Sequence, residues 1–134
     1  GGSTSTNPND YKVIAYCFAD VKGYQKIGMY TGNGSADGPF IYTGFRPSMI
    51  LTKTRATDNW RILDDQRLGY NPSNSILQPS ITQADSNQTW HDILSNGFKL
   101  RTTDSGDNAD GTEYYYYAVG QTLVGSNNVP NNAR

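Results

Sequence analysis

The chain has 134 residues and a formal net charge of −1, with 35% hydrophobic and 17% charged residues. This length fits one domain that can bury a core without disulfide or metal crosslinks. Because nucleic-acid binding depends on Lys and Arg side chains that neutralise phosphates, the near-neutral charge without a basic cluster argues against a nucleic-acid partner.

Uncharged polar residues and glycines make up much of the remainder, which favours short strands joined by turns over long helices. Ten tyrosines contribute apolar ring area with a polar tip, and the aromatic fraction of 12% argues against a disordered chain. No apolar run approaches the ~18 residues of a transmembrane helix, so we expect no membrane insertion.

Residues 1–10 contain only Gly, Ser, Thr, Asn, Asp and Pro, which is typical of a flexible linker or N-terminal arm. Residues 124–134 have a similar composition, and we expect them to form a polar tail. Between these ends, alternating apolar residues, β-propensity and turn residues predict a β domain over residues 11–123. The expected strands are residues 11–20, 24–31, 39–44, 48–55, 59–65, 98–103 and 112–123.

The middle of the chain is less regular. Residues 66–87 have little periodicity, and we expect a long surface loop with a short strand near Ile76 and Leu77. Residues 88–94 are ambiguous, because the spacing of their apolar residues favours one helical turn, whereas the hairpin turn that follows at 95–97 favours a strand. After this turn, clean alternation predicts that Phe98 and Leu100 face the core.

Strands at this spacing predict an all-β fold. We expect a two-sheet β-sandwich of jelly-roll type, with a small β-barrel as the alternative. The first expected strand also echoes the last, since residues 10–20 and 113–122 are both aromatic-rich and acidic at the front. This echo raises the alternative that residues 11–20 are the closing strand of a preceding repeat.

Aromatic residues outnumber what one small core can hide. If residues 114–117 alternate as in a strand, two of these four tyrosines face outward. Rings beside Asn and Asp are suited both to sugars and to protein interfaces, and the sequence leaves the two open. The candidate ligand-binding residues are Tyr42, Tyr70, Trp90 and Tyr115.

The loop at residues 104–111 contains the candidate metal ligands Asp104, Asp107 and Asp110. Carboxylates on a glycine-rich loop can bind Ca²⁺, but the spacing matches neither an EF-hand nor the calcium-binding nonapeptide repeat. A solvated hairpin loop with Asx turns is the favoured interpretation.

No residues stand out as catalytic, so we expect neither an enzyme nor a cofactor. Cys17 lies in an apolar run and is expected to be a small buried core residue. His91, Asp92 and Ser95 include the residue types of a hydrolase triad, but no nucleophile elbow accompanies them. We therefore expect His91 to be a surface or interface residue.

Four segments carry a family resemblance: residues 15–54, 59–67 and 92–104, and the pattern N-x-x-G-T-x-Y-x-Y-x-A from Asn108 to Ala118. In order and spacing they resemble a repeat domain of unknown function found in virion proteins of marine tailed phages, often tail or fibre-like proteins. The chain departs from that pattern after Ala118, where it continues Val-Gly-Gln.

The resemblance implies a lectin-like sandwich in an extracellular virion protein, with a structural role in a tail fibre or surface appendage that attaches to the host. It also implies other virion subunits as partners, a host-surface glycan as a further candidate, and assembly as a homo-oligomer, in the form of a trimer. The alternatives are a capsid decoration protein and a stand-alone carbohydrate-binding module.

Overall fold

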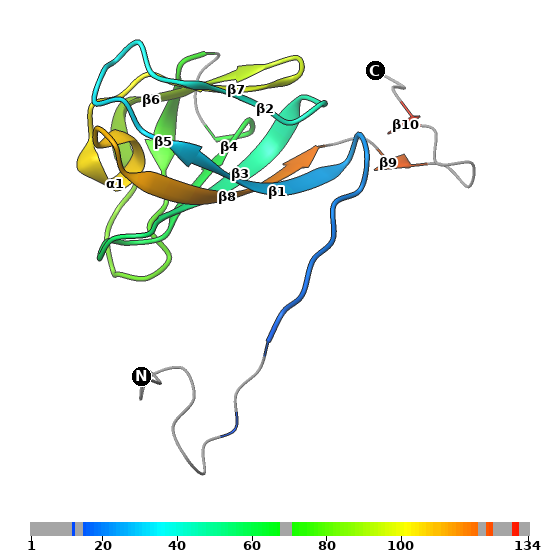
Figure 1. Ribbon diagram of the computed structural model, residues 1–134, viewed down its shortest axis with the longest axis horizontal. Coiled ribbons are helices and arrows are strands. Elements are labelled where there is room, and N and C mark those ends of the chain that lie inside the picture. The colour runs from blue at the N-terminus through cyan, green and yellow to red at the C-terminus, as the bar shows by residue number, and fades with distance from the viewer. Residues whose placement is uncertain (1–11, 13–14, 68–70, 121–122, 125–129, 132–134) are drawn as a thin grey trace.

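A computed structural model of the chain describes residues 12, 15–67, 71–120, 123–124 and 130–131, and in it two antiparallel sheets face each other (Figure 1). The sheet that we call the β8 sheet contains, in spatial order, β1 (Gln25–Thr31), β8 (Glu113–Gly120), β3 (Pro47–Thr54) and β4 (Arg61–Asp64). The other, the β7 sheet, contains β2 (Phe40–Tyr42), β7 (Gly97–Leu100), β6 (Ser86–Leu94) and β5 (Ser73–Ile76). The remaining elements are the short helix α1 (Ser105–Asn108) and a separate two-stranded sheet of β9 (Leu123–Val124) and β10 (Pro130–Asn131).

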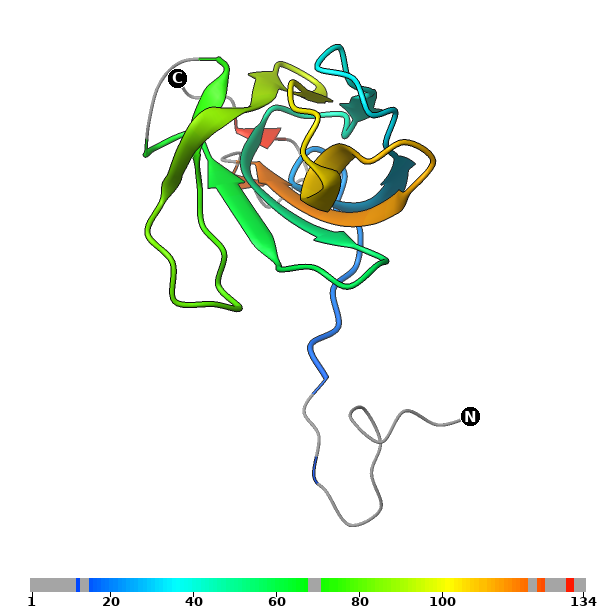
Figure 2. The same cartoon turned by 90° about the vertical axis from the view of Figure 1, so that its left-hand side faces the viewer.

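The two layers confirm the expected sandwich and differ from the alternative of a closed barrel (Figure 2). The pairing is nested along the chain, because β1 pairs with β8, β2 pairs with β7, and a single bridge between Ile62 and Leu77 joins the β4 and β5 sides. This nested winding is the jelly-roll arrangement that the strand spacing predicts.

Alternation along the strands places the core between the sheets. On β8, Tyr114, Tyr116 and Ala118 are buried, whereas the residues between them face outward. Phe98 and Leu100 on the facing sheet are both completely buried, as predicted. The main core comprises Tyr30, Ile41, Phe45, Ile50, Ile93, Phe98, Leu100, Tyr114, Tyr116 and Ala118, and a second cluster comprises Leu63, Ile76 and Trp90.

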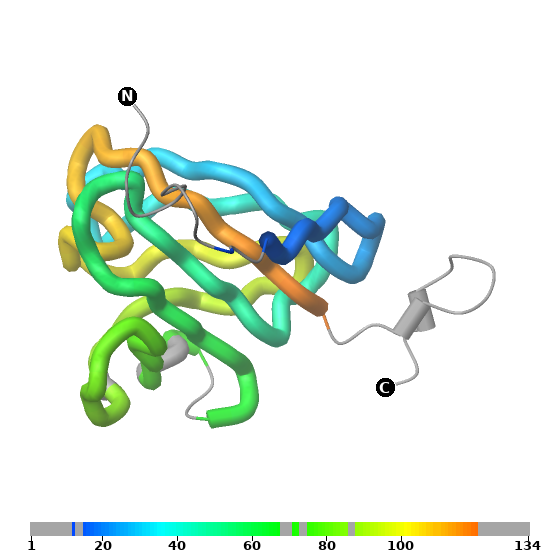
Figure 3. Tube along the Cα trace, turned by 90° about the horizontal axis from the view of Figure 1, so that it is seen from below, coloured from blue at the N-terminus to red at the C-terminus, as the bar shows by residue number. Residues whose placement is uncertain are grey.

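The first expected strand is wrong over the residues that the structure describes. Residues 15–20, which we call the arm, form no strand and lie over the outer face of the β8 sheet, beside β8 (Figure 3). The backbone of Val21 pairs with Gln25, but at the next step the Asp20 carboxylate accepts the Ile27 N–H at 2.9 Å. The Ile27 N–H is thus bonded to a side chain, so a backbone carbonyl of the arm cannot accept it and continue the β ladder along the edge of β1.

The ambiguous segment 88–94 is part of strand β6, and the expected helical turn is absent there. The expected hairpin follows, with β6 and β7 paired around residues 95–96. The short strand expected near Ile76 is present as β5, so the irregular region 66–87 contains an edge strand rather than one uninterrupted loop. Within the described residues, no helix is long and apolar enough to cross a bilayer.

Candidate functional site

The outer face of the β8 sheet is unusually apolar. Four aligned residues, one from each strand, form an apolar row across it: Ile27, Tyr117, Leu51 and Ile62. In the adjacent row Met29 pairs with Tyr115, and these two side chains are 48% and 46% exposed. Because the solvent face of an antiparallel sheet is normally polar, this face has the character of a contact surface.

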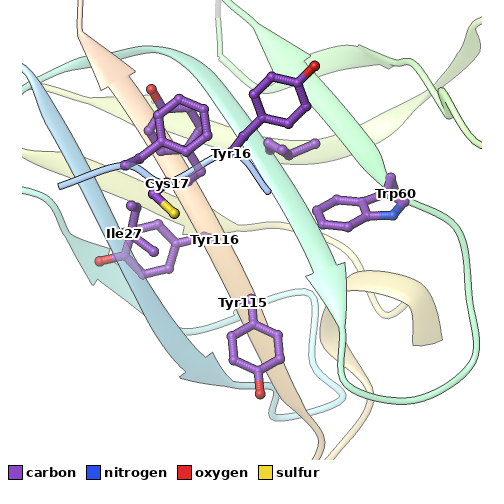
Figure 4. Close-up of a pocket in the computed structure, with 9 residues that line it drawn as sticks. Tyr16, Cys17, Ile27, Trp60, Tyr115 and Tyr116 are labelled. Atoms are coloured by element: carbon purple, nitrogen blue, oxygen red, sulfur yellow. The ribbon is translucent and has the colours of Figure 1, made fainter. Parts of the chain in front are cut away.

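The arm turns part of this face into a groove (Figure 4). The ring of Phe18 stacks on Tyr117 with centroids 4.9 Å apart, which holds the arm against β8. Figure 4 shows Tyr16 and Cys17 on the arm and Trp60 across the groove, at the start of β4. The groove has a volume of 520 Å³ and is lined by Tyr16, Cys17, Phe18, Ile27, Leu51, Trp60, Tyr115, Tyr116 and Tyr117.

Cys17 is therefore not the buried core residue that the sequence predicts, because it is exposed on the arm. On the inner side of the sheet, the position of the Tyr116 ring requires a residue without a side chain at Gly28. A Cβ atom at Gly28 would lie 2.7 Å from the ring and hydroxyl of Tyr116, so the absent side chain makes room for that ring beside β1.

Two arginines around the outer face are paired with carboxylates of the same chain. Arg55 pairs with Glu113 at one end of β8, and the Arg67 Nε donates to Asp64 Oδ2 at 2.6 Å beside β4. The Lys53 Nζ donates to the carbonyl oxygens of Thr54 and Ala56, at 2.8 and 3.1 Å. The arginines of the rim are thus compensated, whereas Lys53, which pairs with Tyr115 in the adjacent row, keeps its positive charge.

The structure separates the candidate ligand-binding residues. Tyr115 lines the groove, whereas Tyr42 lies on β2 of the other sheet, 59% exposed and with Lys26 Nζ 5.4 Å from the centre of its ring. Tyr70 lies outside the described residues. Tyr42 and Tyr115 therefore do not form one binding site.

Trp90 is a correction, because its side chain is only 3% exposed and cannot present a ring to a ligand. It packs with Leu63 and Ile76, and the Arg61 guanidinium lies 5.2 Å from its ring. This cluster lies where β4 and β5 bring the two sheets together, which is why a strand residue near the sheet edge is enclosed.

His91 is also a correction, because it is completely buried rather than on the surface. Its ring stacks on Phe98 with centroids 5.5 Å apart, and its Nε2 lies 3.6 Å from Asp107 Oδ2. The pairing of β5 and β6 shifts register beside it, between Ser73 and Ser75. Simple alternation, which would bury only one of Trp90 and His91, therefore does not hold here.

Asp107 is the centre of a buried polar cluster that joins both sheets to α1. Its Oδ1 accepts a hydrogen bond of 2.7 Å from Thr52 on β3, and its Oδ2 lies 3.6 Å from Arg61 Nη1. Arg61 Nη1 also contacts Asp104 Oδ1 at 2.6 Å. We call Thr52, Arg61, His91, Asp104 and Asp107 the Asp107 cluster.

The electrostatics of this cluster hold Asp107 in its ionised form. Burial by itself raises the pKa of Asp107, but His91, Arg61 and Thr52 outweigh it and place the pKa below the ordinary value of an aspartate. The cluster also depends on Gly106, where a Cβ atom would lie 1.8 Å from Arg61 Nη2.

The same contacts separate the three calcium candidates and bury part of the loop, while an Asx turn of the expected kind is present at Asp104. Asp107 is fully buried and bonded to Thr52, Asp104 accepts from the Gly106 N–H at the start of α1, and Asp110 is exposed. Among the described residues, no three acidic, His or Cys side chains converge as metal ligands. Asp104 and Asp107 tie this loop to the sandwich.

Sequence reasoning missed most of the groove, including Tyr16, Phe18, Ile27 and Trp60, and it also missed the exposed Met29 on the same face. One signal was present: β1 and β3 carry apolar residues at adjacent positions, so both of their faces are apolar. A strand with two apolar faces indicates a second contact layer.

The comparisons with known proteins bear on this architecture as a whole. Residues 1–122 match the family described as Domain of unknown function (DUF7483). The chain belongs to this family. No curated protein and no solved structure matches the chain.

Proposed function

We propose that this DUF7483 chain is a non-catalytic structural domain that docks on another protein through the outer face of the β8 sheet. The observation that carries the proposal is the apolar aromatic groove beside exposed Met29 and Tyr115. Aromatic residues and Met are enriched where proteins meet, and charged residues are depleted at the centre of such surfaces. The outer face has this composition.

Protein fits the groove better than sugar does. A sugar presents hydroxyl groups that need hydrogen-bonding partners, whereas Ile27, Met29 and Leu51 offer only aliphatic contact on this face. A catalytic role has less support still. The histidine His91 and the carboxylate beside it, Asp107, are both completely buried, so a substrate would not reach them.

We further propose that the partner surface belongs to a tailed-phage virion, in which the chain forms part of a tail fibre or surface appendage used for host attachment. The support is the resemblance carried by residues 15–54, 59–67, 92–104 and 108–118. A capsid decoration protein would use the same face for a different virion neighbour.

The test is made in a phage that encodes the chain, with Tyr115→Ser and Trp60→Ser introduced together. We expect the protein to fold, as measured by circular dichroism, but to be lost from purified virions by mass spectrometry, or retained with impaired adsorption to the host. The matched control is Tyr42→Ser, which removes an exposed aromatic ring from the opposite sheet. Normal incorporation and normal adsorption of the double variant would contradict the proposal.

A carbohydrate-binding module is the second candidate function, favoured by the exposed rings of Tyr16, Trp60 and Tyr115 around one groove. Such rings can stack on the apolar faces of sugars. Binding on a glycan array that is abolished by Tyr115→Ala and kept by Tyr42→Ala would support this function, and silence across a broad array would count against it.

A further inference from the structure

We propose that the outer face of the β8 sheet binds a second copy of this chain, in a two-fold symmetric dimer. This inference rests on the docking role proposed above and names its partner. Three properties of the face support it: its area, its shape and its charge.

The exposed apolar area approaches what a stable dimer needs. The aromatic side chains of Tyr16, Phe18, Trp60 and Tyr115 are 80%, 56%, 45% and 46% exposed. At 150–250 Å² for a buried aromatic side chain, these fractions correspond to about 450 Å². Ile27 and Met29 raise the exposed apolar area to about 600 Å², against about 800 Å² per partner in a standard interface.

The face carries both a projection and a recess. Tyr16 on the arm projects into solvent, and the groove between the arm and Trp60 is hollow. In a two-fold interface the same patch is used on both subunits, so each patch must complement itself. A two-fold arrangement allows Tyr16 of each copy to enter the groove of the other.

The charge distribution also suits an identical partner. A face that packs on itself would bring its own charges near their copies, and facing like charges cost binding energy. Here Arg55 and Arg67 are already paired with Glu113 and Asp64, and the Lys53 ammonium is bonded to carbonyl oxygens. The two paired arginines therefore add little repulsion between the copies, and Lys53 is a residual positive charge that the interface has to accommodate.

A single patch of this kind gives a closed dimer. A trimer needs two different surfaces that meet head to tail around a three-fold axis, whereas a two-fold interface needs one. The larger apolar area lies on the outer face of the β8 sheet, while Phe40 and Tyr42 expose two rings on the other sheet, so the dimer uses the larger patch alone.

The experiment is sedimentation equilibrium of the purified 134-residue chain over a series of concentrations. We expect a monomer–dimer equilibrium, and we expect Tyr16→Ser and Trp60→Ser each to raise the dissociation constant about tenfold or more, the factor for about 1.4 kcal/mol at an aromatic contact. Tyr42→Ser, which removes a ring of comparable exposure from the other sheet, should leave the constant unchanged.

Tryptophan fluorescence gives a second measurement on the unmodified protein. Trp90 is buried in the monomer, so a red shift of emission on dilution should report Trp60 alone as it leaves the interface. The proposal would be overturned if the chain were a monomer at every concentration or a trimer. It would also be overturned if neither Tyr16→Ser nor Trp60→Ser changed the dissociation constant of the dimer. A monomer whose face variants are still lost from virions would overturn the dimer but leave the docking role standing, so the two proposals fail separately.

Discussion

The two faces of the β8 sheet reverse the usual pattern, in which charged residues are exposed and large apolar residues are buried. Toward the core the sheet meets a buried arginine, aspartate and histidine, Arg61, Asp107 and His91. Toward solvent it presents Met29 and Tyr115, about half exposed. Burial and stability separate here: Arg61 and Asp107 are held by contacts with Asp104 and Thr52 that the fold needs, whereas the exposed outer residues contact little within the chain.

The largest expected effect comes from breaking the inner cluster. Arg61→Leu removes the guanidinium beside Asp107 and leaves a buried carboxylate without its cation. We expect the free energy of unfolding to fall by about 3–5 kcal/mol, the usual cost of breaking a buried ion pair from one side. Urea denaturation followed by circular dichroism measures it.

Arg55→Leu is the matched control for that variant. Arg55 also pairs with a carboxylate, on Glu113, but both partners are exposed to solvent. Water replaces such a pair at little cost, so we expect almost no change in stability. Equal effects of the two substitutions would show that the burial of Arg61 carries no special weight.

Substitutions of two neighbouring tyrosines on opposite faces of β8 should differ in their effect on stability, by less than the effect of Arg61→Leu. The Tyr114 hydroxyl donates to the Ser105 carbonyl at 2.6 Å and accepts from the Ala109 N–H at 2.7 Å, which ties both ends of α1 to the sheet. Tyr114→Phe leaves both backbone groups without this partner, and we expect a loss of about 1–3 kcal/mol. In the same urea assay Tyr115→Phe, on the outer face, should be neutral, and similar losses would contradict the assignment.

Acid should weaken the inner face selectively. The folded-state pKa of Asp107 lies below the ordinary aspartate value of about 3.9. The ionised carboxylate therefore stabilises the fold above that value, and this contribution is lost as the pH falls through the folded-state pKa. We expect the free energy of unfolding, measured in urea, to decline below about pH 4. The loss should be smaller than on removal of Arg61, because protonated Asp107 is a neutral carboxyl group and not an unpaired buried charge.

Asp107→Asn tests the source of that decline. The variant cannot titrate at this position, so its stability should depend less on acid than that of the unmodified chain. Parallel pH profiles would assign the decline to other groups, among them Asp64, whose contacts with Arg67 and Gln66 outweigh its burial and also lower its pKa.

The sequence predicts the strands better than it predicts what contacts them. Alternation places β1, β3 and β8 within a few residues of their observed bounds and buries Phe98 and Leu100 correctly. The same alternation gives a false strand over the arm. Nothing local shows that the Asp20 carboxylate would take the Ile27 N–H and end the pairing.

The inner cluster was hidden for a different reason. A loop of Asp, Gly and Asn is typical of a solvated turn. Arg61 reaches Asp107 only because the fold places β4 next to this loop. The burial of such an aspartate is a tertiary event, because its cation comes from a distant strand. The groove was predictable in part. Its aromatic residues are visible in the sequence, but the strand order, which the sequence does not show, decides that they share one face.

The smallest expected effect is on the outer face. Trp60→Ser removes a ring that is 45% exposed, so the stability of the monomer should change by no more than about 0.5 kcal/mol. The measurement is urea denaturation at a concentration low enough for the chain to be monomeric. At high concentration the unmodified protein should gain stability that the variant lacks, because a partner that binds only the folded state stabilises it. A large loss in the dilute monomer would show instead that the outer face is needed for folding, and the contrast between the two faces would fail.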